Sequence, residues 1–306
     1  MKSGNSLFSA AKLIQSDTIE AVFLPEYGML GASLQFHGVE ILRKIEDLET
    51  SARRGSSVGI PILYPWANRL YEFEFEVAGK KIQLDRSSPM IHLDEKGLPL
   101  HGVPWAQLKW HLRDVQQDQL SAELNWTTPV LLQILPFPHD VKMNAVAQAN
   151  TLKIETQITA YTDLEVPISF GFHPYIGIPE LDRSQWKLKL PEMKKLVLNE
   201  RRIPTGEIQE FAGYDAELGS NEFDHGFELL DTHTEFSIEG AGWKISIHVL
   251  NGYTHAQVFA PPDKEFIALE PMTAPTNALV SKQNLRILKS GETFSASFAV
   301  VVDKSL

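Results

Sequence analysis

The stretch FSIEGAGWKISIHVL (residues 236–250) alternates apolar and polar side chains on both sides of a glycine-bounded turn. Successive residues of a β-strand point to opposite faces, so this period of two gathers the apolar side chains on one face. The stretch therefore predicts a β-hairpin with one buried and one exposed face. The residues expected on the buried face are Phe236, Ile238, Trp243, Ile245 and Ile247.

The same period of two recurs along the chain. YEFEFEVAGKKIQL (71–84) predicts a second hairpin, TLKIETQITAYT (151–162) a long strand, and FSASFAVVV (294–302) a closing strand. Helical periodicity is weak, since VEILRKIEDLETSARR (39–54) fits either an amphipathic helix or a strand followed by a short helix. The side chains expected to share one face of the second hairpin are Tyr71, Phe73, Phe75 and Val77.

Many strands separated by turns, with few segments suited to be crossover helices, are typical of an all-β protein. We expect a large antiparallel β-sandwich with few short helices, built as a single domain over residues 1–306. A chain of this length can bury the two-sheet core that such a domain needs.

The composition limits the partners of this protein. A formal net charge of -11 disfavours nucleic acid and anionic membrane surfaces as general partners. A small neutral ligand fits this charge, whereas a phosphorylated ligand would need a local basic pocket.

The absence of cysteine excludes disulfides, thiolate catalysis and thiolate metal ligands. MKSGNSLFSAAKLIQ (1–15) lacks the apolar core of a signal peptide, and no apolar run approaches the roughly 20 residues that span a bilayer. We expect a soluble, cytoplasmic protein.

Two weak signals do not define a site. GSSVG (55–59) has the spacing of a serine-hydrolase elbow, but no apolar strand precedes it. The ten histidines are scattered, so no metal site is expected.

Five other segments interrupt the strand pattern with prolines, glycines and polar groups. Loops held by a rigid sheet are where functional groups tend to lie. Taken alone, each polar residue also has a structural interpretation, for example Arg69 in an ion pair or Asp224 as a turn former. The segments are GIPILYPWANRL (59–70), LPLHGVPWAQLKW (98–110), GFHPYIGIP (171–179), NEFDHGF (221–227) and IALEPMTAPTNAL (267–279).

His173 and Glu270 share one arrangement, because each directly precedes a proline. Proline restricts the preceding residue to extended conformations, so the backbone limits where each side chain can point. A histidine and a carboxylate constrained in this way are suited to act as an acid–base pair.

Together these segments resemble the aldose 1-epimerase (galactose mutarotase) family, in the family's order and from about residue 20 to the end. The similarity is carried by PILYPWANRL (61–70), LHG (100–102), GFHPY (171–175) and LEPMTAPTNAL (269–279). The resemblance implies a galactose mutarotase-like supersandwich with an open cleft on one sheet. It also implies a small-molecule sugar as substrate, no cofactor or metal, and a monomer or weak dimer.

The resemblance implies roles for six residues. His173 is similar to the catalytic acid and Glu270 to the catalytic base. The residues similar to the sugar contacts are Asn68, Arg69, His101 and Asp224. The match FDHGF (223–227) is short, so His225 stays open as an alternative to Asp224.

Anomer exchange needs one proton to leave O1 of a pyranose and another to reach the ring oxygen O5. Glu270, expected to be ionised, would accept the first proton. His173, expected to be protonated and favoured in that state by a carboxylate such as Asp224, would donate the second. We expect the two side chains on opposite sides of the anomeric carbon. The aromatic residues considered as a wall for the sugar ring are Trp66, Trp105, Phe172 and Tyr175.

Alternatives remain open from the sequence. A hexose-6-phosphate 1-epimerase would need a phosphate pocket, which Arg53 and Arg54 are near enough in sequence to supply. A non-catalytic carbohydrate-binding sandwich is an alternative of another class. A glycosidase fits less well, because it needs two facing carboxylates.

Overall fold

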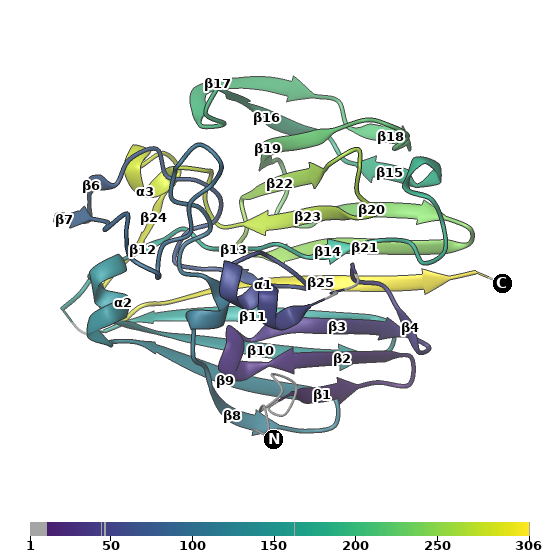
Figure 1. The fold of residues 1–306 in the computed structure, drawn as a ribbon, viewed down its shortest axis with the longest axis horizontal. Helices are drawn as coiled ribbons and strands as arrows, with labels where there is room; N and C mark the ends of the chain where they lie inside the picture. The colour runs from purple at the N-terminus through teal and green to yellow at the C-terminus, as the bar shows by residue number, and fades with distance from the viewer. Residues whose placement is uncertain (1–10, 44, 46, 162, 306) are drawn as a thin grey trace.

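The computed structural model describes residues 11–43, 45, 47–161 and 163–305. Most of the stretch considered above as a signal sequence lies outside the described residues. Within the described ranges, no helix is both long and apolar enough to cross a membrane. Figure 1 shows strands stacked side by side through most of the molecule, with only short helices among and beside them.

The first layer is a nine-stranded sheet whose strand pairs are antiparallel (Figure 1). In sheet order the strands are β18 (Tyr214–Glu217), β15 (Lys187–Leu190), β20 (Thr234–Gly240), β21 (Trp243–Asn251), β25 (Thr293–Lys304), β11 (Thr151–Ala160), β10 (His139–Gln148), β9 (Gln119–Trp126) and β8 (His111–Val115). The inner strands alternate buried and less buried residues, which is the pattern of a sheet packed on one face.

The second layer contains an eight-stranded sheet and a four-stranded sheet. The eight-stranded sheet runs β17 (Pro204–Phe211), β16 (Met193–Leu198), β19 (Phe223–Leu229), β22 (His255–Ala260), β23 (Ile267–Met272), β13 (Gly171–Phe172), β5 (Ile62–Leu63), with β14 (Tyr175–Ile176) also paired to β23. The four-stranded sheet is β1 (Lys12–Gln15), β2 (Ile19–Leu24), β3 (Leu30–Phe36) and β4 (Val39–Glu40).

Isolated bridges connect these two sheets, one between Gly31 and Ile60 and another between Leu42, just after β4, and Ile176 of β14. The amide of Ile60 donates to the carbonyl of Gly31 at 2.8 Å. Gly59 makes the approach feasible, because it has φ 63° and a Cβ there would lie 2.2 Å from the Gly31 oxygen. The junction therefore requires glycine at position 59.

Smaller elements surround the two layers. Two ribbons pair β6 (Glu74–Val77) with β7 (Lys80–Gln83), and β12 (Val166–Ile168) with β24 (Arg286–Leu288). The helices among the described residues are α1 (Leu48–Arg54), α2 (Pro129–Ile134) and α3 (Ala278–Ser281), with 3-10 turns η2 (Pro25–Tyr27), η3 (Trp105–Gln107) and η4 (Arg183–Gln185).

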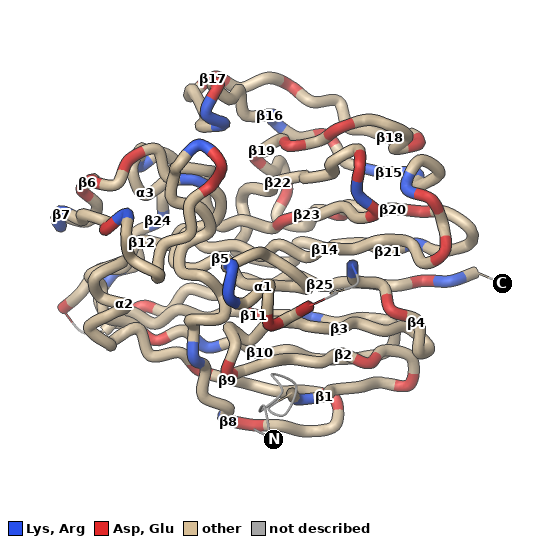
Figure 2. The backbone as a smooth tube through the Cα atoms, viewed as in Figure 1, with Lys and Arg blue, Asp and Glu red and all other residues tan. Residues whose placement is uncertain are grey.

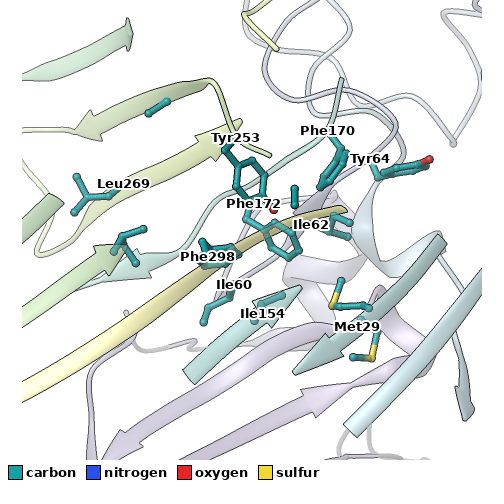
Figure 3. Packing of buried hydrophobic residues seen from close by; sticks show 14 of the residues in the cluster. Met29, Ile60, Ile62, Tyr64, Ile154, Phe170, Phe172, Tyr253, Leu269 and Phe298 are labelled. Atoms are coloured by element: carbon teal, nitrogen blue, oxygen red, sulfur yellow. The ribbon is translucent and has the colours of Figure 1, made fainter. Parts of the chain in front are cut away.

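The core lies between the layers. Figure 3 shows Phe172 from β13 facing Phe298 from β25, and their ring centroids are 5.0 Å apart. Ile154 from β11 and Leu269 from β23 belong to the same buried cluster. Burying such side chains between two sheets removes apolar surface from water and stabilises the sandwich. The predicted all-β antiparallel sandwich is confirmed.

Both predicted hairpins are present. β20 pairs with β21 so that Gly240 faces Trp243, and the two turn residues, Ala241 and Gly242, have φ of 47° and 81°. Positive φ at both central positions suits the right-handed twist of paired strands. All five apolar residues predicted to be inside are buried. β6 and β7 form the second hairpin around Ala78 and Gly79.

One detail differs from the expectations, and one open alternative is settled. Tyr71 is 40% exposed rather than inward, because its amide donates to the Asn277 side chain and the strand begins only at Glu74. For residues 39–54, the alternative of a strand followed by a short helix is correct. The Asp47 carboxylate accepts the amide of Thr50 and thereby begins α1 only after that residue.

Candidate active site

The irregular segments predicted from the sequence meet around one cavity of about 400 Å³. This volume is in the range of small-molecule sites. All six residues singled out by resemblance line it, from five separate parts of the chain. The full lining is Ser57, Asn68, Arg69, His92, Glu95, Leu100, His101, His173, Tyr175, Arg202, Asp224, Gln257, Phe259 and Glu270.

The floor of the cavity is the middle of the eight-stranded sheet. Glu270 lies in β23, directly opposite Gln257 of β22. His173 lies between β13 and β14, and its amide donates to the carbonyl of Pro61 at 3.1 Å. Glu270 is held by its strand and His173 by the short strands on both sides of it and by its backbone hydrogen bond, so both side chains have defined positions.

His173 and Glu270 contact one another. His173 Nε2 lies 3.2 Å from Glu270 Oε1, and the two side chains are only 6% and 2% exposed. Within the protein the two side chains lie side by side. Their placement on opposite sides of a substrate carbon stays a prediction.

Burial sets the protonation of this pair. It lowers the pKa of His173 to about 3 and raises the pKa of Glu270 well above its ordinary value. Burial therefore favours a neutral imidazole beside a protonated carboxyl group over the expected ion pair. Both forms contain the same number of protons, so they differ only in where one proton sits.

Tyr175 supports the histidine ring. The two rings stack with centroids 4.2 Å apart and an interplanar angle of 14°. Tyr175 Oη also lies 3.3 Å from His173 Nε2. Among the described residues, His173 Nδ1 and Glu270 Oε2 have no hydrogen-bond partner. Buried polar atoms of this kind are costly unless a ligand or water satisfies them.

Arg69 and His101 form the opposite wall. Arg69 Nε binds Asp94 Oδ2 at 2.7 Å, and its Nη1 donates to Asn68 Oδ1 at 3.1 Å. The amide of Asn68 donates to His101 Nδ1 at 3.2 Å. His101 therefore carries its hydrogen on Nε2 and is a donor there. Burial, reinforced by His173 and Arg69, lowers the pKa of His101 well below its ordinary value and keeps the ring neutral.

The backbone of this wall is unusual. Asn68 and His101 have φ of 58° and 60°, in the left-handed region that residues with a Cβ disfavour. Gly102 follows with φ 68°, and a Cβ there would lie 2.2 Å from the Tyr64 carbonyl oxygen. Such strain is commonly stored where a site needs a particular side-chain direction.

Asp224, not His225, lines the cavity. The two are neighbours in β19, so they point to opposite faces, and His225 packs edge-on near Phe223 and Phe227. Asp224 pairs with Arg202 and accepts from Gln257 Nε2 at 2.6 Å. The carboxylate that contacts His173 is therefore Glu270, not Asp224.

Sequence reasoning missed several lining residues, notably Gln257 and Arg202. HAQVFA (255–260) reads as an ordinary strand, so nothing in it singles out Gln257. Of the aromatic residues considered as a wall, Tyr175 lines the cavity, while Trp66, Trp105 and Phe172 are buried in apolar clusters. Over the described ranges, no cluster of three or more His, Cys, Asp or Glu side chains is arranged to hold a metal ion.

Comparisons with known proteins agree with this architecture. Among curated proteins, the chain is similar to the uncharacterized protein YihR of Escherichia coli (strain K12), with 23% identity over 249 residues, 78% of this chain and 77% of that one. A galactose mutarotase-like protein from Clostridium acetobutylicum has a similar structure, with a TM-score of 0.82 at 21% identity over 96% of this chain and 95% of that one. The Slr1438 protein from Synechocystis sp. PCC 6803 gives a TM-score of 0.76 at 24% identity over 96% of each chain. These likenesses confirm the galactose mutarotase-like fold.

The family model described as Aldose 1-epimerase matches residues 13–300. The match contains every segment that meets at the cavity, and it confirms the resemblance drawn from the motifs. This protein belongs to the aldose 1-epimerase family.

Proposed function

We propose that this protein interconverts the α and β anomers of a free aldohexose. The observation that carries the proposal is the contact between His173 and Glu270 on the cavity floor, 3.2 Å apart and almost fully buried. Two proton-transfer groups at this distance can serve the two oxygens of one anomeric carbon together.

Ring opening uses the ion-pair form. The Glu270 carboxylate takes the proton from O1, the O1 electron pair forms C1=O1, the C1–O5 bond breaks, and O5 takes a proton from His173 Nε2. The pair is then neutral, which is the form that burial favours. After rotation about C1–C2, the same steps in reverse close the ring on the other face of the aldehyde.

Sugar binding favours the ion-pair form needed at the start. Glu270 Oε2 lacks a partner among the described residues, and a sugar hydroxyl can donate to it. A hydrogen bond to the ionised form of a carboxyl group lowers its pKa, and so moves the proton toward His173.

The charges around the cavity support an uncharged sugar over a phosphorylated one. Arg69 and Arg202 are each paired with a carboxylate, and Glu95 adds a further carboxylate to the lining. Arg53 and Arg54 are not among the described residues that line the cavity, and Arg53 donates instead to Thr50 Oγ1 at 3.2 Å. Pairing with a carboxylate balances the charge of each guanidinium, which weakens its attraction for a phosphate dianion but leaves N–H donors for a neutral hydroxyl.

The test is the rate of anomer exchange in the variant Glu270→Gln, followed by polarimetry on freshly dissolved α-glucose and α-galactose. An amide cannot accept the O1 proton, so we expect the catalysed rate to fall by about 10³-fold, while sugar binding measured by calorimetry changes little. Glu123→Gln, the same change on β9 outside the cavity, is the control and should keep the parental rate.

The outcomes separate the alternatives. A Glu270→Gln variant as fast as the parent would remove this residue from the mechanism. A parent that binds sugars without accelerating exchange would be a carbohydrate-binding protein. Faster exchange of glucose 6-phosphate than of glucose would identify the phosphorylated sugar as substrate.

A further inference from the structure

Arg202 lies in the turn between β16 and β17, at the rim of the cavity. Its φ of 61° is in the left-handed region. The side chain of Asn199 fixes this turn, since its Oδ1 accepts the amides of Arg201 and Ile203 at 2.9 and 3.1 Å. A strained backbone that its surroundings hold in place suggests that the direction of the Arg202 side chain matters.

The turn is also attached to the opposite rim of the cavity. The Lys96 ammonium group donates to the Glu200 carbonyl oxygen. The Arg201 guanidinium lies 5.1 Å from the centre of the Tyr71 ring. Figure 2 shows the basic turn before β17 close to a loop that carries both acidic and basic segments. These contacts present Arg202 to the cavity in a defined position.

The guanidinium of Arg202 ends a polar row across the cavity floor. Its Nη1 pairs with Asp224 Oδ2, and Asp224 Oδ1 accepts from Gln257 Nε2 at 2.6 Å. Gln257 is the strand partner of Glu270. The row therefore crosses β23, β22 and β19, with the catalytic pair at one end and Arg202 at the other.

We propose that Arg202 binds a ring hydroxyl of the substrate and sets which hydroxyl arrangement the site accepts. A guanidinium has five N–H donors, and the pairing with Asp224 leaves others for a sugar oxygen. Arg202 as donor and Asp224 as acceptor lie side by side, which matches two neighbouring hydroxyls of a pyranose. A sugar whose anomeric carbon contacts His173 and Glu270 extends its remaining hydroxyls toward this end of the row.

This proposal rests on the proposed function. Its test asks whether removing the Arg202 side chain and removing one sugar hydroxyl change KM independently or through the same contact. The variants are Arg202→Ala and Arg202→Lys, assayed for kcat and KM on the preferred aldohexose and on its 2-, 3-, 4- and 6-deoxy analogues. For the full sugar, we expect Arg202→Ala to raise KM about tenfold with kcat within about twofold, the size expected for one charge-assisted hydrogen bond. Arg202→Lys keeps the positive charge but loses the planar guanidinium with its several N–H donors. Its KM should therefore lie between those of the parent and Arg202→Ala.

The decisive comparison is among the deoxy sugars. For one of them, the parent and Arg202→Ala should have equal KM, because removing the hydroxyl or the guanidinium breaks the same contact. Arg113→Ala is the matched control, since it makes the same change on β8 (His111–Val115), outside the cavity. It should keep the parental KM for every sugar. Unfolding temperatures show that each variant is folded.

Three outcomes overturn the role of Arg202: an unchanged KM in Arg202→Ala, an equal rise in KM for the full sugar and all deoxy analogues, or the same rise in Arg113→Ala. A parent that accelerates no anomer exchange refutes the proposed function instead. In that case the same sugars and variants are compared by their Kd, measured by calorimetry. If Arg202→Ala weakens binding equally for the full sugar and every deoxy analogue, the role of Arg202 is overturned. If the parent binds no sugar, both proposals are overturned.

Discussion

At the scale of single residues, the sequence predicts the identity of the proposed catalytic pair but not its protonation. His173 and Glu270 could be selected from the sequence because proline follows each and because their segments match family motifs. Their protonation could not be predicted, because it depends on burial by segments distant in the chain. Phe259, for example, places its ring 6.0 Å from that of His173 although the two are separated by a long stretch of sequence.

The altered pKa values predict an unusual pH profile. The pair keeps its single proton between the lowered pKa of His173, about 3, and the raised pKa of Glu270. Acidification from pH 6.5 to 4.5 protonates neither partner further, so kcat/KM for anomer exchange should not fall over this range. The measurement is NMR of anomer exchange with the uncatalysed rate subtracted. A decrease with its midpoint near pH 6.5 would show that His173 has an ordinary pKa.

At the scale of elements, the sequence indicates which segments are irregular but not how they meet. The segments around His101 and Asp224 are far apart in the chain, and only strand order brings them to one cavity. Gln257 shows the limit most clearly. Its strand has no unusual composition, and its importance comes from pairing beside Glu270 and binding Asp224. Alternation predicts that a strand forms, whereas its neighbours in the sheet depend on long-range pairing.

The turn that carries His101 allows a controlled test of backbone strain. Gly102 and Gly97 have similar φ, 68° and 71°, but a Cβ at position 97 would meet nothing within 4 Å. Gly97→Ala therefore measures the cost of left-handed φ alone, about 1 kcal/mol. Gly102→Ala adds the clash with the Tyr64 carbonyl, and we expect it to lower the free energy of unfolding by at least about 2 kcal/mol more. Urea unfolding of both variants gives the two values, and equal losses would exclude the clash.

At the scale of the whole molecule, we propose that residues 1–306 fold as one domain. The buried cluster that contains Ile154 of the first layer also contains Leu269 of the second. Because the layers share this core, neither can lose its packing without exposing the other. We expect calorimetry and tryptophan fluorescence to report a single, coincident thermal transition. Two separate transitions would show independently folding parts.

The division between a floor of paired strands and a rim of turns affects how this protein can be redesigned. The floor carries Glu270 and Gln257, which are held by neighbouring strands on both sides. The rim carries Arg202, which is held by a short turn. Directed evolution toward other sugars should therefore diversify the two facing turns at 95–97 and 200–202. This choice spares Asp94, the partner of Arg69, and Asn199, so new preferences can arise while the proposed catalytic pair keeps its geometry.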